Sequence, residues 1–189
     1  MKTAFALLLT MWLAIISLAV VEETPAEPLV EEPTNGEAII AAPLVVPAEP
    51  TVELYDVPLS EELQLHIIRL CDEYGIDPAL VIAMIRYESN YHANAVGDGG
   101  DSIGLMQIQP YWHSGRMERL GCNDLYDPFQ NVTVGIDIIA GKLDSYETAG
   151  EALTAYNAGD YGAYEYYFSK GVYANSYAEK ILAYAEELN

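Results

Sequence analysis

The sequence is poor in basic residues. Only 8 of its 189 residues are Lys or Arg, against 29 Asp and Glu, so the formal net charge is -21. Proteins that bind nucleic acids neutralise phosphates with clustered Lys and Arg, and no such cluster is present. We therefore exclude nucleic acid as a partner. The acidic balance also disfavours electrostatic adhesion to anionic polymers, so binding has to come from a groove of aromatic and amide groups.

Cysteine and metal motifs are scarce as well. Two cysteines, Cys71 and Cys122, are too few for a disulfide framework. We expect two buried thiols, because Cys71 falls on the apolar side of a predicted helix, although an exported protein can join them in one bridge. The histidines, His66, His92 and His113, show no ligand spacing with Cys or Asp. A Gly-rich phosphate loop and a nucleophile elbow are also missing, so we expect no metal and no cofactor.

The first 21 residues are predicted to direct export. Lys2 is followed by an uncharged apolar stretch over residues 4–21, and Ser17-Leu18-Ala19 offers the small-x-small pattern that signal peptidase cuts after. At about 18 residues the stretch also reaches the lower limit for a membrane-spanning helix. Residues 1–21 are therefore either a signal peptide or an uncleaved N-terminal membrane anchor. Both interpretations predict an exported protein that is secreted or anchored and faces the cell exterior or its wall.

Residues 22–57 are predicted to be a disordered linker rich in proline, glutamate and alanine. Six prolines are spread along it and no basic residue occurs. Repeated prolines prevent a continuous helix and favour an extended, solvated chain. The linker either tethers the following domain at a distance or is a leader that contributes only solubility.

Residues 58–189 are predicted to form one domain that is mostly α. Helix starts are signalled at Ser60, Asp77-Pro78, Asp127-Pro128, Thr148 with Glu151, Asp160 and Asn175, and helix ends at Gly75, Gly159 and Gly171. Buried stripes are predicted at Leu63, Ile67, Leu70 and Tyr74, and at Val132, Ile136, Ile139 and Leu143. The sequence contains no convincing alternating strand. Only residues 94–103 are compatible with a minor hairpin.

Glu88 is the strongest candidate for a catalytic residue. It follows the apolar run Leu80–Ile85 after Arg86 and Tyr87, in the last turn of the helix that Asp77-Pro78 opens. Burial and the negative end of the helix dipole both raise the pKa of a carboxyl there from its usual value of about 4.3, which suits a general acid. Position alone is equally compatible with a glutamate that pairs with Arg86 or is solvated beyond the helix end.

Four short motifs surround this glutamate in a characteristic order. They are Glu88-Ser89, Gly104-Leu105-Met106-Gln107-Ile108, Ala155-Tyr156-Asn157-Ala158-Gly159 and Tyr177-Ala178-Glu179-Lys180-Ile181. Over residues 59–188 this order resembles the soluble lytic transglycosylase (SLT) family of lysozyme-like peptidoglycan enzymes. The resemblance implies a lysozyme-like multi-helix catalytic domain with a substrate groove, and peptidoglycan glycan strands as the partner. We expect a monomer.

The resemblance also implies a role for each motif residue. Glu88 would protonate the oxygen between N-acetylmuramic acid and N-acetylglucosamine, and then take the proton of the muramoyl C6 hydroxyl as a 1,6-anhydro ring closes. The implied substrate-binding residues are Ser89, Met106, Gln107, Tyr156, Asn157 and Tyr177. The hydroxyl of Tyr177 is expected to contact the Glu88 carboxyl.

Two other classes of function stay open. Hydrolysis of a glycosidic bond ordinarily takes two carboxyl groups. Asp98 and Asp101 lie on a Gly-rich loop, where capping or exposure is the expected role, so a hydrolase of the goose-lysozyme or chitinolytic kind is disfavoured. A catalytically silent wall-binding or assembly protein is disfavoured by the intact Glu88.

Overall fold

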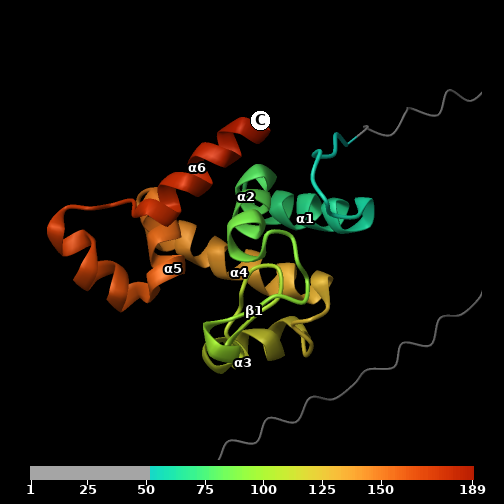
Figure 1. The fold of residues 1–189 in the computed structure, drawn as a ribbon, viewed down its shortest axis with the longest axis horizontal. Helices are drawn as coiled ribbons and strands as arrows, with labels where there is room; N and C mark the ends of the chain where they lie inside the picture. Colours follow the sequence, from blue (N-terminus) through green and yellow to red (C-terminus); the bar gives the residue numbers. More distant parts are fainter. Residues whose placement is uncertain (1–51) are drawn as a thin grey trace, which may run out of the picture. The chain divides into compact units, whose positions relative to one another are not determined.

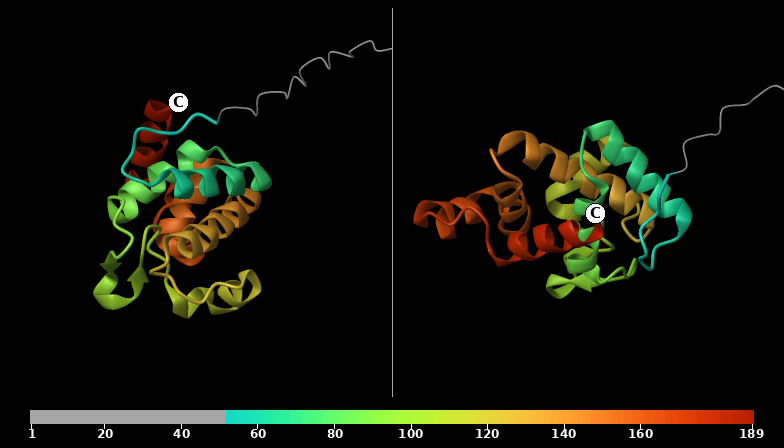
Figure 2. Two further views of the ribbon diagram at one scale, coloured as in Figure 1. Left: turned by 90° about the vertical axis from the view of Figure 1, so that its right-hand side faces the viewer. Right: turned by 90° about the horizontal axis from the view of Figure 1, so that it is seen from above.

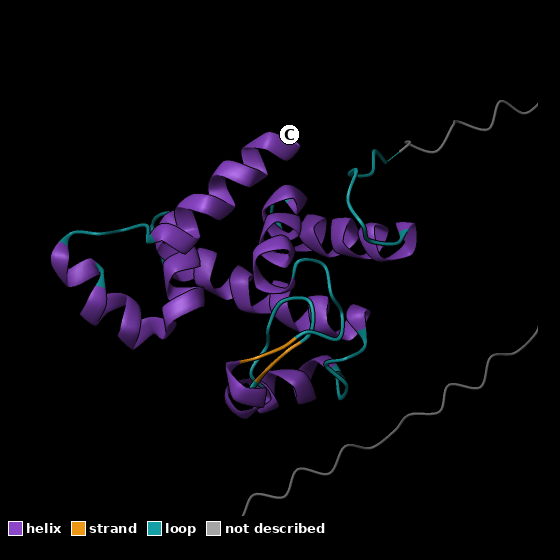
Figure 3. Ribbon diagram, viewed as in Figure 1, coloured by secondary structure: helices purple, strands orange, loops and turns teal. Residues whose placement is uncertain are grey.

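The computed structural model describes residues 52–189, whose regular structure is mostly helical (Figure 3). In chain order the elements are α1 (Glu61–Tyr74), α2 (Pro78–Ser89), β1 (Val96–Gly97), the 3-10 helix η1 (Asp98–Gly100), β2 (Ser102–Ile103), α3 (Pro110–Leu120), α4 (Pro128–Ser145), α5 (Ala149–Tyr166), the 3-10 helix η2 (Phe168–Lys170) and α6 (Ser176–Leu188). The prediction of a mostly α domain is confirmed. Residues 1–21, and the predicted linker up to residue 51, lie outside the described residues.

Five of the six predicted helix starts are confirmed by side-chain caps. Ser60, Asp77, Asp127, Thr148 and Asn175 each accept a hydrogen bond from a backbone N–H in the first turn of the helix that follows. Such a cap typically stabilises a helix by about 1 kcal/mol, because the first N–H groups have no partner within the helix. The minor hairpin is confirmed as well, with Val96 opposite Ile103 and Gly97 opposite Ser102.

Helix α3 was not predicted from the sequence. Pro110 in its first turn and Gly121 at its end, where φ is 69°, are ordinary helix signals. None of its side chains is fully buried, however, so the helix has no apolar stripe that periodicity could reveal. Among residues 52–189, no helix combines the length and apolar character that crossing a membrane requires.

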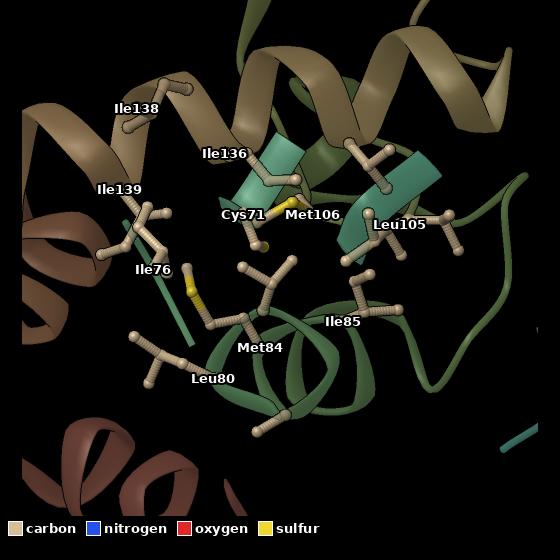
Figure 4. Packing of buried hydrophobic residues seen from close by; sticks show 14 of the residues in the cluster. Cys71, Ile76, Leu80, Met84, Ile85, Leu105, Met106, Ile136, Ile138 and Ile139 are labelled. Atoms are coloured by element: carbon tan, nitrogen blue, oxygen red, sulfur yellow. The ribbon is translucent and has the colours of Figure 1, made fainter. Parts of the chain in front are cut away.

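Helix α2 lies at the centre of the hydrophobic core. All seven residues from Ala79 to Ile85 are buried, as the absence of a polar face in the sequence indicated. Figure 4 shows Met84 and Ile85 of α2 facing Ile136 and Ile139 of α4, with Met106 in the same cluster. Helix α6 packs along α2, whereas α1 and α5 pack on α4 (Figures 1 and 2). The carboxyl-terminal turn of α2, which carries Glu88, is thereby held in place from several sides.

Tyr74 departs from the predicted stripe of α1. The residue is 41% exposed, and its hydroxyl donates to Asp137 Oδ1 at 2.9 Å. Asp137 of α4 also forms ion pairs with Arg116 and Arg119 of α3. Burial alone would raise the pKa of Asp137, but these donors and charges lower it, so the carboxylate stays ionised and joins three helices. The hydrogen bond to Asp137 therefore accounts for the position of Tyr74 outside the predicted apolar stripe.

Two further predictions concern the cysteines and the linker. Cys71 and Cys122 are both buried and both free, so the expectation of two thiols is confirmed. The predicted linker of residues 22–57 includes Tyr55, which packs against the core and whose N–H donates to Gln64 Oε1 at 2.9 Å. The folded part of the chain therefore begins before residue 58.

Gly159 divides α5 into two parts. Its φ of 70° and ψ of 161° are not helical and lie in a region that essentially only glycine adopts. The predicted helix end at this residue is thus found as a break, after which the chain resumes a helical course from Asp160. This second part of α5, η2 and the connection to α6 project away from α4 (Figures 1 and 2).

Candidate active site

A groove with a volume of about 960 Å³ collects most of the candidate residues. Glu88, Gln107, Tyr156 and Asn157 line it, and these four were predicted from the sequence. Residues that the sequence did not indicate complete its walls: Ser102 and Gln109 near the hairpin, Trp112 and His113 of α3, Lys142 of α4, and Asp160, Tyr161 and Tyr166 of α5. Asp98, which the sequence assigned to capping or exposure, also lines the groove.

Glu88 forms a hydrogen bond with Tyr177. The hydroxyl of Tyr177, on α6, donates to Glu88 Oε1. Burial of the carboxyl is the main cause that raises the pKa of Glu88 to about 7, and the negative charge of Asp98 raises it further, while the Tyr177 hydrogen bond acts in the opposite direction. Near neutral pH the carboxyl is therefore divided between its acid and base forms, so chemically it can either donate or accept a proton.

Arg86 does not neutralise Glu88. Its guanidinium lies 4.3 Å from the centre of the Tyr184 ring, which it contacts through a cation–π interaction. Within the described part of the chain, Glu88 forms no ion pair. The interpretation of Glu88 as the partner of Arg86 is therefore wrong.

Tyr156 of α5 lies near Glu88 and connects α5 to the Gly104–Ile108 segment. Its hydroxyl donates to the backbone carbonyl of Met106 at 2.9 Å. The pKa of Tyr156 and that of Tyr177 are both raised well above the usual value for tyrosine. Burial is the main cause, and the negative charge of Glu88 is the second. Both hydroxyls consequently remain protonated and act as donors.

The Gly104–Ile108 segment is held by one buried residue, Asn131 of α4. Its Oδ1 accepts from Met106 N at 2.8 Å, and its Nδ2 donates to the carbonyls of Ile103 and Leu125, both at 2.9 Å. Gly104, with φ at 78°, passes so close that a Cβ there would lie 2.1 Å from Asn131 Nδ2. Sequence reasoning missed Asn131, because a single asparagine between apolar residues carries no motif.

Gln107 is oriented by its own loop. Its Nε2 donates to Gly104 O at 2.9 Å and to Ala95 O at 3.3 Å, and its backbone adopts a positive φ of 47°. Its Oε1 lies against Gly97, where a Cβ would approach to 2.3 Å. The amide is thus fixed at the groove before any substrate binds.

The remaining motif residues differ in their relation to the groove. Met106 is fully buried and packs against Gly135 of α4, so it contributes its backbone carbonyl rather than its side chain. Ser89 donates to Ile85 O at 3.1 Å within α2 and is not among the lining residues. Asn157 is exposed in the groove, where its Oδ1 accepts from Asn175 Nδ2 at 3.1 Å.

Charged and aromatic groups form the outer walls. Lys142 pairs with Asp160, which also accepts from the hydroxyl of Tyr146 at 2.8 Å. This pair joins α4 to α5 directly after the break at Gly159. Three aromatic side chains of the walls are largely exposed, namely Trp112, Tyr161 and Tyr166. Over residues 52–189, no three His, Cys, Asp or Glu side chains are grouped as a metal site would need.

Comparisons with known proteins match one family and several relatives. The family model of the Transglycosylase SLT domain matches residues 66–170. Invasion protein IagB of Salmonella typhimurium (strain LT2) is 35% identical over 92 residues, which are 46% of this chain and 57% of that protein. The transglycosylase of Enterobacteria phage PRD1 is 33% identical over 87 residues, 46% of this chain and 31% of that protein. This chain thus spans about half the length of IagB and less of the phage protein.

A solved structure shows the same fold. The lytic transglycosylase Slt of Pseudomonas aeruginosa, determined as an inactive mutant, superimposes with a TM-score of 0.56. The match is 20% identical and covers 68% of this chain and 24% of that chain.

Proposed function

Since this chain belongs to the Transglycosylase SLT domain family, we propose that it is a peptidoglycan lytic transglycosylase. The reaction cleaves the β-1,4 bond between N-acetylmuramic acid and N-acetylglucosamine and leaves a 1,6-anhydromuramic acid end. One observation carries the proposal: a carboxyl group with a pKa of about 7, hydrogen bonded to Tyr177, lines a groove.

Glu88 acts first as an acid. At neutral pH a large fraction of the carboxyl is protonated, so it can donate to the oxygen of the bond that breaks. The carbonyl oxygen of the neighbouring 2-acetamido group bonds to C1 as the leaving oxygen departs, which replaces the second carboxyl of an ordinary glycosidase.

Glu88 acts next as a base. Once ionised, it takes the proton of the C6 hydroxyl, whose oxygen bonds to C1 as the acetamido oxygen is released. The hydrogen bond from Tyr177 favours the ionised form that this step requires. The fixed Tyr177 and Gln107 side chains favour catalysis because their orientation is set before the substrate arrives.

The groove walls suit a glycan strand. Trp112 on α3 and Tyr161 and Tyr166 on α5 present exposed rings to the groove, and such rings stack on the apolar faces of sugars. Gln107 and Asn157 supply amide groups that can bind hydroxyl and acetamido groups. With a net charge of -21, the protein binds a wall polymer through these contacts rather than through positive charge.

Hydrolysis of the same bond is a second candidate, because Asp98 lines the groove together with Glu88. A second carboxylate could activate a water molecule. The two reactions differ in product, since hydrolysis adds one water and transglycosylation adds none.

Product analysis tests the proposal. Purified peptidoglycan is digested in heavy-oxygen water, and the released muropeptides are weighed by mass spectrometry. We expect unlabelled 1,6-anhydromuramic acid ends, and we expect Glu88→Gln to lower turnover by about a hundredfold to ten-thousandfold. Glu186→Gln, at an exposed position of α6, is the matched control. Labelled reducing ends would establish the hydrolase, and a wild-type protein that binds without cleaving would establish the wall-binding alternative.

The proposal includes export to the wall. Residues 1–21 would deliver the protein as a signal peptide or hold it as an anchor, and residues 22–51 would carry the domain away from the membrane. The mass of the protein recovered from cells separates the two forms, because cleavage removes the first residues. Light scattering of the purified protein tests the expected monomer.

A further inference from the structure

Asp98 occupies an unusual backbone position at the edge of the groove. It begins the short turn η1 between β1 and β2, with φ at 48°. A positive φ is uncommon for a residue other than glycine, and such outliers gather at functional sites. The preceding Gly97 leaves room for Gln107 Oε1, so the loop brings Asp98 and Gln107 to the same groove.

The Asp98 carboxylate is held on one side only. Its Oδ2 accepts from Ser102 Oγ at 2.6 Å and from Gln109 Nε2 at 3.2 Å. Gln109 Nε2 also donates to Ser102 Oγ at 3.1 Å, and Ser102 is only 3% exposed. Asp98 Oδ1 has no hydrogen-bond partner among residues 52–189, so it is available to a bound molecule.

The other charged groups of the groove do not neutralise Asp98. Lys142 of α4 is the one lysine that lines the groove, and it forms an ion pair with Asp160 of α5 rather than with Asp98. Burial, and then the charges of Arg116 and Lys142, lower the pKa of His113 of α3, so this side chain is neutral at pH 7. Tyr177 and Tyr156, which border Glu88 from α6 and α5, are protonated and uncharged. In the described structure, Asp98 is therefore the one carboxylate of the groove, besides Glu88, that has no cationic partner.

We propose that Asp98 is the second working carboxylate of this site. Through Oδ1 it accepts the N–H of the 2-acetamido group on the sugar whose C1 reacts, and its charge balances the positive charge that develops there. This inference rests on the proposed function of the groove. It differs from the expectation drawn from the sequence, which assigned Asp98 to capping or exposure.

The chemistry of the first step shows why this position matters. The acetamido carbonyl oxygen forms a bond to C1 while the bond from C1 to the leaving oxygen breaks. The leaving oxygen keeps the electron pair of the broken bond and takes the proton of Glu88. The acetamido group thereby becomes a cyclic cation whose N–H is a stronger donor than that of the amide. A fixed carboxylate that accepts this N–H stabilises the cation more than the ground state, as catalysis requires.

Asp98→Asn tests the proposal, with Asp101→Asn in the same loop as the matched control. Asn keeps an oxygen that can accept from Ser102 and Gln109 but removes the charge. We expect Asp98→Asn to lower kcat by about a hundredfold, with little change in KM, and Asp101→Asn to leave both within about threefold. The alkaline limb of the kcat profile should move to lower pH in Asp98→Asn, because the Asp98 charge raises the pKa of Glu88.

The two proposals fail in distinguishable ways. If kcat and the pH profile of Asp98→Asn match those of Asp101→Asn while Glu88→Gln is inactive, Asp98 has no catalytic role and the proposed function stands. Heavy-oxygen label at the product ends would show that water, and not the C6 hydroxyl, attacks C1, and would overturn both. Circular dichroism confirms folding of each variant. Should Asp98→Asn misfold, Asp98→Ser takes its place, with the same loss of kcat expected and a wild-type kcat overturning the proposal.

Discussion

Glu88→Gln is expected to stabilise the folded protein above pH 7 and to leave its stability unchanged at low pH. Burial raises the pKa of Glu88 from 4.5 to about 7, which means that ionisation is easier in the unfolded chain than in the folded one. Below pH 4.5 both states are protonated and the group has no effect on stability. As the pH rises from 4.5 to 7, the unfolded state loses its proton first, so the free energy of unfolding falls.

The size of the effect follows from this difference in pKa. At about 1.36 kcal/mol for each pH unit, an increase from 4.5 to about 7 corresponds to about 3 kcal/mol of lost stability above pH 7. Gln has nearly the same volume, carries no charge, and keeps an oxygen that can accept from the Tyr177 hydroxyl. If the free energy of unfolding falls by about 2 kcal/mol for each M of urea, the urea midpoint of Glu88→Gln above pH 7 should lie about 1.5 M above that of wild type.

Urea denaturation at pH 4 and pH 8 measures this prediction. We expect the two midpoints to coincide at pH 4 and to separate at pH 8, while the substitution removes activity. Glu186→Gln is the control and should change the midpoint little at either pH. Equal midpoints of wild type and Glu88→Gln at pH 8 would refute the reasoning, since they would show that the folded protein ionises this carboxyl without a penalty.

Three further predictions follow from the geometry. Tyr177→Phe should raise the pKa of Glu88 above about 7, because it removes a hydrogen bond that stabilises the ionised carboxylate. The alkaline limb of the kcat profile should therefore move to higher pH, in the direction opposite to that expected for Asp98→Asn. Gly135→Ala should destabilise the fold by about 1 to 3 kcal/mol in urea, since a Cβ there lies 2.2 Å from a buried methionine sulfur, whereas Gly141→Ala in the same helix has free space and should stabilise it. Tyr161→Ala should raise the KM for glycan strands about threefold to tenfold and leave kcat unchanged, whereas Tyr164→Ala, on an exposed residue outside the groove lining, should change neither.

Local signals predicted the helices well. Capping residues and the apolar run before Glu88 depend on neighbours within a few positions, so the sequence contains nearly all the information. The missed α3 shows the limit of this reasoning, because a helix that buries none of its side chains fully has no periodic pattern. Tyr74 shows another limit, since its partner Asp137 lies on a different helix.

The site was predicted in part, for a similar reason. Motif order identified Glu88 and Tyr177, which are 89 positions apart and nevertheless hydrogen bonded. The roles of Asn131 and Asp98 depend on where separate segments meet in space, and no spacing in the sequence reveals that. Met106 shows the converse, because a motif residue acts there through its backbone while its side chain fills the core.

The position of Tyr177 has a consequence for how the protein is made. Helix α6 follows every other described helix in the chain, and the family match ends at residue 170, before α6 begins. During synthesis the amino-terminal residues emerge first, so α2 can form before Tyr177 has been added. A growing chain then holds Glu88 without the donor that orients it. The arrangement of Glu88 and Tyr177 that we propose for catalysis is therefore complete only after α6 has docked on α2, when synthesis of these residues has ended.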